Sequence, residues 1–252
     1  MIDLHCHIIP NVDDGPQSQA ESMAMARLAV EDGIRTIVAT PHTLNGVYTN
    51  HIQQIISHVA DLQEAFSKNQ IDLRLYAGAD VHLCPDMLER IESGDAGTID
   101  NAKRYMLLEF PPQTIPAGIK DEVFNLKVHG ITPIITHPER HPMIHHDVNI
   151  LYELIRMGAL GQMTAMSISG DFGGIVMGCS EMLLRNRLIH VIASDAHSPD
   201  SRPPLLSQAV EIAAEILGNY EEAERMVKDV PAAILAGDAV EVSEPSLAKS
   251  RV

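Results

Sequence analysis

Histidines that end short apolar segments are the residues of this 252-residue sequence best suited to chemistry. The chain begins Met1-Ile-Asp-Leu-His5-Cys-His7, so an apolar start leads into two histidines two positions apart. Alternate side chains of a β-strand point to the same side. A strand ending here would therefore present His5 and His7 to one side and Cys6 to the other, which is the arrangement of a pair of metal ligands.

Three later apolar segments also end in histidine, at His42, His137 and the Asp195–His197 pair. Carboxylates follow other segments in a similar way. Because catalytic groups collect at the carboxyl ends of barrel strands, these side chains are expected to converge. Imidazole nitrogen and carboxylate oxygen together suit manganese, iron or zinc. We predict a multinuclear metal site with these ligands: His5, His7, Asp14, His42, Asp80, Glu109, His137, Asp195 and His197.

The alternative for each histidine is a structural role, because a lone histidine on an apolar strand is more often a hydrogen-bonded core residue than a ligand. Chance placement at the ends of four strands is much rarer, which favours the metal site. The other histidines are interpreted as structural or solvated: His51, His58, His82, His129, His141, His145, His146 and His190.

The elements that would position these ligands follow from a recurring order of helix, glycine and apolar strand, at Gly33, Gly130 and Gly158. Glycine just past a helix adopts the left-handed conformation at low cost, and a short β-rich apolar run behind it is typical of a strand buried on both faces. About seven parallel strands are predicted, at 2–4, 34–40, 73–77, 105–109, 131–136, 159–165 and 188–193. Their alternation with amphipathic helices indicates an α/β fold, an incomplete or distorted (β/α) barrel.

Two helix starts support this spacing. Ser18 and Glu21 form the pattern of a capping box, and Pro85-Asp86 begins a short helix that extends to Ile91. No linker interrupts the pattern, so we expect a single domain over 1–242, with a flexible tail at 243–252.

The bulk composition narrows the function classes. With 34 acidic against 18 basic residues, the formal charge of -16 disfavours nucleic acid as a partner. Apolar runs such as 34–39 are far shorter than the roughly 18 residues that a spanning helix needs. The N-terminus lacks a secretory pattern. Cys6, Cys84 and Cys179 form no CxxC pair and fit reduced thiols. We expect no membrane insertion and a cytoplasmic location.

One motif points to a different chemistry. Cys179 and Arg185 satisfy the Cys-x5-Arg spacing of thiol-based tyrosine phosphatases. The residues between them are good helix formers, with Met182 and Leu183 placed to be buried, and no histidine precedes the cysteine. We therefore assign Cys179 to the core of a helix.

Taken together, several segments resemble the PHP (polymerase and histidinol phosphatase) superfamily. They are His5-Cys-His7, Asp13-Asp-Gly15, Ala39-Thr-Pro-His42, His137-Pro-Glu-Arg140 and Ser194-Asp-Ala-His197. With Leu107-Leu-Glu-Phe-Pro111 and Asn45-Gly-Val-Tyr48, the similarity extends from Met1 to about Gln208. The finer resemblance is to a bacterial branch of manganese-dependent tyrosine-protein phosphatases encoded with capsular and exopolysaccharide genes.

This resemblance implies a distorted (β/α)7 TIM-like barrel, the PHP fold, with three divalent metal ions at the strand ends. Manganese is the favoured metal, and iron or zinc are alternatives. By position, the first ion would be held by His5, His7, Asp80 and Asp195, the second by Asp80, Glu109 and His137, and the third by Asp14, His42 and His197. The family usually has Glu in a Gly-x-Glu sequence where this chain has Asp80, which is one methylene shorter. His82, on the same strand face, could compensate, although we interpret it as solvated.

Two arginines match the family positions for phosphate contact. Arg140 follows His137 by three residues, and Arg202 follows His197 by five. Guanidinium groups recognise phosphoryl oxygens in a planar, bidentate way, while bound metals activate water. We expect Arg140, Arg202 and Asp195 to be catalytic.

Three functions follow as hypotheses. The first is a phosphotyrosine phosphatase that acts on a phosphotyrosine-containing protein, the tail of a bacterial tyrosine autokinase that controls capsular or exopolysaccharide synthesis. The second is a histidinol-phosphate phosphatase or another small-molecule phosphoesterase, because one metal core serves several esters. The third is a non-catalytic metal-binding regulatory module, which only the Asp80 departure supports. The sequence leaves open whether the protein forms a homo-oligomer.

Overall fold

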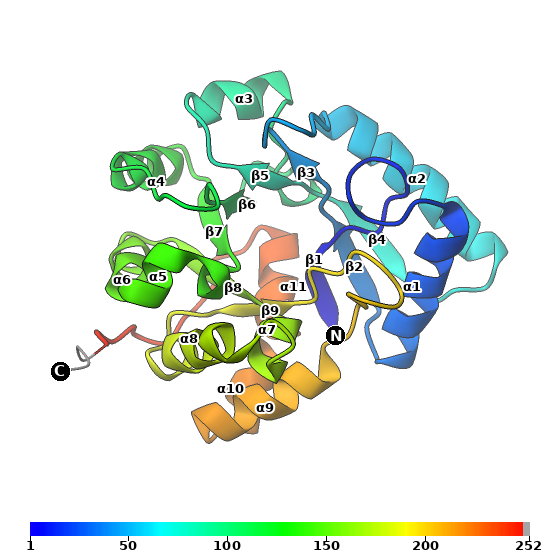
Figure 1. The fold of residues 1–252 in the computed structure, drawn as a ribbon. Helices are drawn as coiled ribbons and strands as arrows, with labels where there is room; N and C mark the ends of the chain where they lie inside the picture. The colour runs from blue at the N-terminus through cyan, green and yellow to red at the C-terminus, as the bar shows by residue number, and fades with distance from the viewer. Residues whose placement is uncertain (249–252) are drawn as a thin grey trace.

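The computed structural model describes residues 1–248, in which a ring of parallel strands is surrounded by helices (Figure 1). The strands are β1 (Ile2–Cys6), β2 (Thr36–Ala39), β3 (His42–Thr43), β4 (Arg74–Ala77), β5 (Asp80–His82), β6 (Tyr105–Glu109), β7 (Thr132–Thr136), β8 (Leu160–Thr164) and β9 (Val191–Ala193).

These nine strands occupy seven positions in the part of the chain described, because β3 continues β2 and β5 continues β4. The hydrogen-bonded orders are β1-β2-β4 and β3-β5-β6-β7-β8-β9, and Pro41, which has no N–H to donate, lies between β2 and β3. Between β1 and the end of β9, Asp195 N donates to His5 O and His7 N donates to Ala196 O, both at 2.8 Å. The predicted distorted seven-stranded barrel is confirmed.

All seven predicted segments contain a strand, with shifts of one to three residues at most ends. The glycines that were expected to end helices before strands, Gly33, Gly130 and Gly158, have φ of 93°, 79° and 95°. This left-handed conformation is the one that only glycine adopts at low cost. The helix-glycine-strand pattern therefore correctly predicted where the chain enters β2, β7 and β8, because each of these turns needs a left-handed residue.

Most helices lie outside the ring of strands and connect one strand to the next, whereas α11 lies across the ring (Figure 1). The α-helices are α1 (Gln19–Glu31), α2 (Ile52–Lys68), α3 (Met87–Ser93), α4 (Ile119–Val128), α5 (Pro142–His146), α6 (Asn149–Arg156), α7 (Ala165–Ser169), α8 (Gly174–Arg185), α9 (Ser207–Leu217), α10 (Tyr220–Arg225) and α11 (Asp229–Ala236), and the 3-10 helices are η1 (Ile99–Asn101) and η2 (Pro138–Arg140).

The two predicted helix starts differ in detail from the structure. Ser18 caps α1 by accepting from Glu21 N at 3.3 Å, but the Glu21 carboxylate accepts from Gln17 N rather than from Ser18 N. The second hydrogen bond of the predicted capping box, the one to the Glu21 carboxylate, therefore comes from the residue before Ser18. Helix α3 begins at Met87, later than predicted, because Asp86 has a left-handed φ of 63°.

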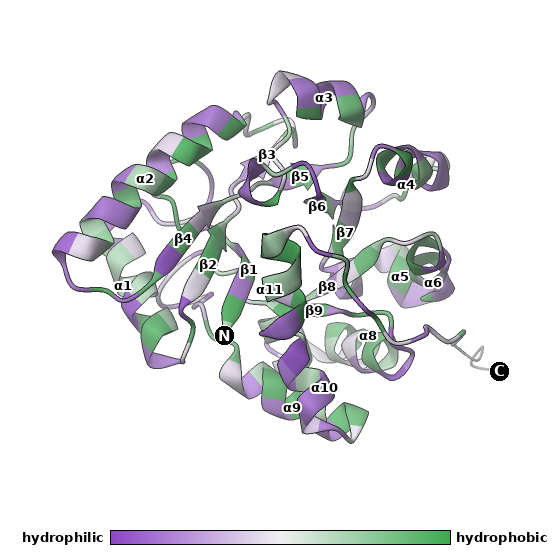
Figure 2. Cartoon of the chain, turned by 180° about the vertical axis from the view of Figure 1, so that it is seen from behind, coloured by the Kyte–Doolittle hydropathy of each residue, from purple (hydrophilic) through white to green (hydrophobic). Residues whose placement is uncertain are grey.

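Two apolar clusters stabilise the fold. The larger one fills the space between the strands and the outer helices, and the smaller one fills the barrel interior with side chains such as Leu4, Leu107 and Ile134. Val230 and Ile234 of α11 belong to the interior cluster. Seen from behind, α11 lies across the middle of the ring of strands (Figure 2). It closes the end of the barrel opposite to the strand carboxyl ends.

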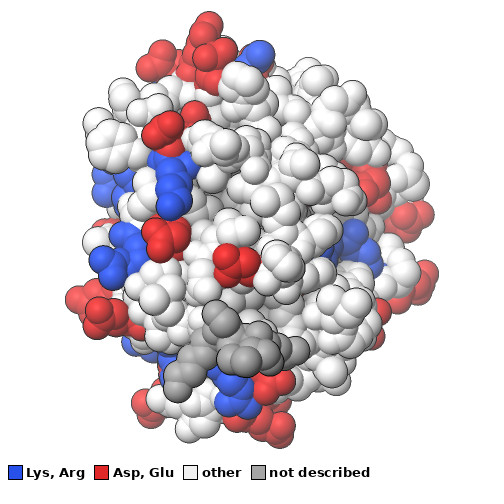
Figure 3. Space-filling model, turned by 60° about the vertical axis from the view of Figure 1, so that its left-hand side comes forward, with Lys and Arg blue, Asp and Glu red and all other residues white. Residues whose placement is uncertain are grey.

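The surface reflects the acidic composition. Acidic side chains gather over α3 at the top of the face drawn in Figure 3, and a broad area of this face carries no charged side chain. None of the helices in residues 1–248 is long and apolar enough to cross a membrane.

The C-terminal segment leaves α11 without regular secondary structure. Ser246 N donates to Asn186 O, and Ala248 N donates to Asn149 Oδ1, each at 3.0 Å. The domain limit at 242 and the flexibility of the tail stay predictions, and the last four residues of that tail, 249–252, lie outside the described residues.

His190, directly before β9, is buried in the barrel wall, so of the two roles expected for it, structural or solvated, the structure supports the structural one. Gly161 N donates to its Nδ1 at 3.0 Å, while no described residue bonds its Nε2. Burial lowers the pKa of His190 to about 4. The folded chain therefore keeps this imidazole neutral at pH values where the unfolded chain protonates it.

We predict that His190 weakens the fold as the pH falls from about 6.5, the ordinary histidine pKa, to about 4. In that pH range His190 is protonated in the unfolded state and neutral in the folded state. The free energy of unfolding therefore falls by up to about 1.4 kcal/mol for each unit by which the pH decreases. Urea unfolding at constant metal concentration should show a shallower acid loss of stability in His190→Gln than in the parent chain. His58→Gln, on the exposed side of α2, is the control, and parallel profiles for all three proteins would contradict the prediction.

Candidate metal centre

The carboxyl ends of the strands bring all nine predicted ligands to one mouth of the barrel. Strand β1 and the loop behind it supply His5, His7 and Asp14; β3, β5 and β6 supply His42, Asp80 and Glu109; and the segments after β7 and β9 supply His137, Asp195 and His197.

Donor atoms of these residues form three overlapping groups within 4.8 Å of one another. The groups are His7, Asp14, His42 and His197; His5, His7 and Asp80; and His42, Asp80 and Glu109. They resemble the grouping implied by the family, except that His7 and His42 each take part in two groups. The site is therefore a continuous cluster rather than three separate sets of ligands.

The two remaining predicted ligands lie at the edges of these groups. His137 Nε2 lies 3.7 Å from Glu109 Oε1 and 4.0 Å from Asp80 Oδ2. Asp195 Oδ1 lies 3.5 Å from the Nε2 atoms of both His5 and His7. The structure thus brings every predicted ligand into contact with at least one other.

Unpaired buried donors indicate that this cluster suits cations. His42 Nδ1, Asp80 Oδ2 and His197 Nε2 are buried and accept or donate no hydrogen bond among the described residues. Such groups are costly to bury unless they have a partner. Two of them, His42 Nδ1 and Asp80 Oδ2, face each other at 3.2 Å. The donor set therefore fits bound divalent metal.

Three of the histidines are oriented by a second contact. His7 Nδ1 pairs with Asp13 at 2.6 Å, His5 Nδ1 with Gln162 Oε1 at 2.9 Å, and His197 Nδ1 with the Asp195 carbonyl at 2.9 Å. Each contact leaves Nε2 directed into the cluster, which is the usual arrangement behind metal-binding histidines.

Sequence reasoning missed the roles of Asp13 and Gln162. A signal existed for each, since Asp13 adjoins Asp14 and Gln162 is a polar residue inside a predicted buried strand. Neither signal identifies the histidine that the side chain contacts. The contact from Gln162 to His5, for example, joins residues 157 positions apart.

The electrostatics act differently on the individual ligands, which bind metal in their deprotonated forms. Burial lowers the pKa of His5 to about 4, so this imidazole is neutral near pH 7. Burial alone would raise the pKa of Asp195, but the charge of Arg140 outweighs it and holds that pKa well below its usual range. Burial would lower the pKa of His7, yet Asp13 raises it to about 10, so a metal at His7 displaces a proton.

Asp80 reaches the centre of the cluster although its side chain is shorter than Glu. It is fully buried, and its Oδ2 lies 3.6 Å from His5 Nε2 and 3.2 Å from His42 Nδ1. His82 is only 18% exposed and lies 3.6 Å from Glu109 Oε2. The interpretation of His82 as solvated is therefore wrong, because the β5 strand turns it toward the site.

Two of the ligands have a strained backbone. His137 and Asp195 have left-handed φ values of 35° and 50°. For residues other than glycine this conformation costs on the order of 1 kcal/mol or more and persists where the surrounding structure enforces it. At both positions the strand ends and the side chain turns into the mouth.

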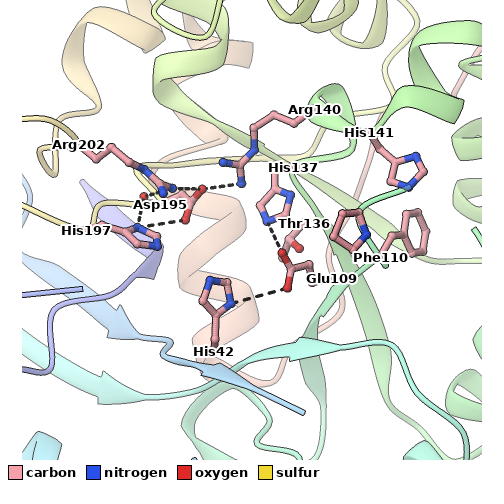
Figure 4. A pocket seen from close by; sticks show the side chains of 11 residues that line it. His42, Glu109, Phe110, Thr136, His137, Arg140, His141, Asp195, His197 and Arg202 are labelled. Atoms are coloured by element: carbon pink, nitrogen blue, oxygen red, sulfur yellow. Dashed lines mark hydrogen bonds and ion pairs between the residues drawn. The ribbon is translucent and has the colours of Figure 1, made fainter. Parts of the chain in front are cut away.

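A cavity of about 270 Å³ opens onto this cluster, lined by five of the predicted ligands and by both arginines. Asp195 lies between the arginines, and its Oδ2 accepts from Arg140 at 2.6 Å and forms an ion pair with Arg202 at 2.7 Å (Figure 4). The same terminal nitrogen of Arg202 donates to the Asp195 carbonyl at 2.8 Å. His141, interpreted from the sequence as structural or solvated, also lines the cavity while its Nε2 contacts the Pro111 carbonyl at 3.0 Å.

The cysteine motif does not form a phosphate loop. Cys179 lies inside α8, is 6% exposed, and burial raises the pKa of its thiol to about 12. A thiol of this kind is not a nucleophile near neutral pH. The assignment of Cys179 to the core is confirmed.

The fold and the donors together define a barrel protein whose histidine and carboxylate side chains form a metal centre at the strand ends. Residues 1–236 match the family described as capsular polysaccharide synthesis, CpsB/CapC. The chain belongs to this CpsB/CapC family.

Individual relatives agree with that assignment. The chain is 37% identical to a putative tyrosine-protein phosphatase CapC of Staphylococcus aureus, over 91% of this chain and 89% of the relative. It is 37% identical to the tyrosine-protein phosphatase YwqE of Bacillus subtilis, over 80% of this chain and 79% of the relative. A solved structure from work on YwqE of Bacillus subtilis and CpsB of Streptococcus pneumoniae, described as unique metal-dependent tyrosine phosphatases, superimposes with a TM-score of 0.93 at 33% identity, over 99% of this chain and 100% of that one.

We predict that divalent metal stabilises the folded chain, because it neutralises the carboxylates gathered at the mouth. Manganese at about 100 times its Kd should add about 2.7 kcal/mol, which for a domain of this size is on the order of 5 to 10 °C in Tm. Glu109→Gln should reduce this shift, whereas Asp61→Asn on the exposed side of α2 should leave it intact. Metal-stripped parent protein that shows no shift, and no metal by elemental analysis after reloading, would contradict a metal centre here.

Proposed function

We propose that this chain is a metal-dependent protein-tyrosine phosphatase. The observation that carries the proposal is the single cavity in which the ligand cluster and the guanidinium groups of Arg140 and Arg202 face the same space. The family membership and the relatives named as tyrosine-protein phosphatases support the same activity.

Three divalent ions would be held by the nine ligands, with manganese favoured and iron or zinc as alternatives. Asp80 would be the shared ligand, since its Oδ2 lies within 4.0 Å of His5, His42 and His137. When bound, such ions lower the pKa of water toward neutrality and stabilise the attacking and leaving oxygens of an in-line displacement.

Arg140 and Arg202 bind the transferring phosphoryl group in this proposal. Each uses one terminal nitrogen to contact Asp195 Oδ2, so its other N–H groups are left for the oxygens of a phosphate in the cavity. Asp195 fixes the arginines through Oδ2 and faces the histidines with Oδ1. The guanidinium charges are therefore placed before substrate arrives, which is the condition for stabilising charge in a transition state.

The physiological substrate that we propose is a phosphotyrosine-containing protein, the tail of a bacterial tyrosine kinase that acts in capsular or exopolysaccharide synthesis. A cytoplasmic location is part of this proposal. It fits the three cysteines, which are all unpaired thiols in the structure.

A comparison of substrates tests the proposed function. Metal-loaded protein should turn over a phosphotyrosyl peptide with a higher kcat/KM than histidinol phosphate or a phosphoseryl peptide. Strong chelation should remove this activity, and manganese should restore it best. Faster turnover of histidinol phosphate would favour a small-molecule phosphoesterase, and no turnover of any ester, p-nitrophenyl phosphate included, would favour a non-catalytic module.

We predict that Arg140→Ala and Arg202→Ala each lower kcat/KM by roughly 10² to 10³, which corresponds to about 3 to 4 kcal/mol of transition-state stabilisation. Asp195 keeps one arginine partner in each variant, so the bound metal measured by elemental analysis should not change. Arg156 provides a matched control, since it lies over the Tyr152 ring at 6.0 Å on the exposed side of α6. Kinetics like those of Arg156→Ala in both variants would show that phosphate binds elsewhere.

A further inference from the structure

Phe172 lies beside the site in the segment between α7 and α8. The Cζ atoms of Arg140 and Arg202 lie 5.5 Å and 5.9 Å from the centre of its ring. One aromatic side chain is therefore in contact with both guanidinium groups of the proposed phosphate site.

The ring interacts favourably with both cations, because the face of an aromatic ring carries partial negative charge. Arg140 and Arg202 are 25% and 27% exposed, so water screens these contacts only in part. The two arginines are also drawn to the same oxygen of Asp195, which brings like charges together. A ring shared by both guanidinium groups offsets part of that repulsion.

The local backbone brings the ring to this place. Gly170 ends α7 with φ of 93°, and Gly173 precedes α8 with φ of 91°. Both values lie in the left-handed region that favours glycine. Phe172 is thus carried on a tight connection between two helices rather than on a long loop, and its position relative to η2 and to the segment that carries Arg202 is constrained.

We propose that Phe172 is a positioning residue that holds the two guanidinium groups in the orientation needed for phosphate. Asp195 contacts each arginine through its terminal nitrogen, and the Phe172 ring limits the rotation of the guanidinium plane about that contact. This inference rests on the proposed function, because it assigns to Phe172 an effect on the same phosphate site.

The test is binding of inorganic phosphate to metal-loaded protein, measured by titration calorimetry, together with kcat and KM for a phosphotyrosyl peptide. Phe172→Leu retains apolar bulk but removes the ring, and we expect phosphate affinity and kcat/KM to fall roughly tenfold. Phe172→Tyr and Phe172→Trp keep an aromatic face and should keep both values. Phe124→Leu is the matched control, since Phe124 is a 60% exposed residue of α4.

A double-mutant cycle separates positioning from a general structural effect. In an Arg140→Ala, Arg202→Ala background, Phe172→Leu should cause no further loss of phosphate affinity, because the groups that the ring positions are gone. An equal loss in both backgrounds, or a Phe172→Leu variant that binds phosphate as tightly as the parent, would overturn the inference. Phosphate binding without turnover of the peptide by the parent would instead reject the proposed function and leave the role of Phe172 measurable.

Discussion

The carboxylate of Asp195 joins the two halves of the site. One of its oxygens faces the imidazoles of His5 and His7, and the other accepts from Arg140 and forms an ion pair with Arg202. A buried carboxylate is stable only with such partners, so the ionised form of Asp195 and the positions of the four cationic or metal-binding groups depend on one another. Whatever holds Asp195 in place therefore also sets the distance between the ligand cluster and the two arginines.

The barrel itself supplies that support. Asp195 N donates to the His5 carbonyl, and the buried carboxylate of Asp3 accepts from Ser194 N at 2.9 Å. These bonds join the first and last strands of the ring next to the ligands that each strand carries. The bonds that close the barrel therefore also bring the ligands of its first and last strands together. Contacts on both sides of Asp195 hold its backbone in the left-handed conformation.

The sequence predicted the strands and the nine clustered side chains because both leave local signals. A short apolar run followed by His or Asp is visible in a few adjacent residues, and parallel strands must place such ends at one edge. The supporting contacts leave no local signal. The contact of Gln162 with His5, the contact of both arginines with the Phe172 ring, and the packing of α11 against the barrel interior each join residues far apart in the chain. Only the folded arrangement identifies them. His82 was misjudged for the same reason, since its contact is with Glu109 on the neighbouring strand β6.

Closure of one end of the barrel limits how the products of the proposed phosphatase reaction can leave. Helix α11 fills the far end with Val230 and Ile234, so the cavity above the ligands does not continue through the barrel. In the proposed reaction, the phosphoryl group held by the arginines would lie inside this cavity, and the protein that carried it would lie outside. The dephosphorylated protein would therefore leave before the phosphate ion.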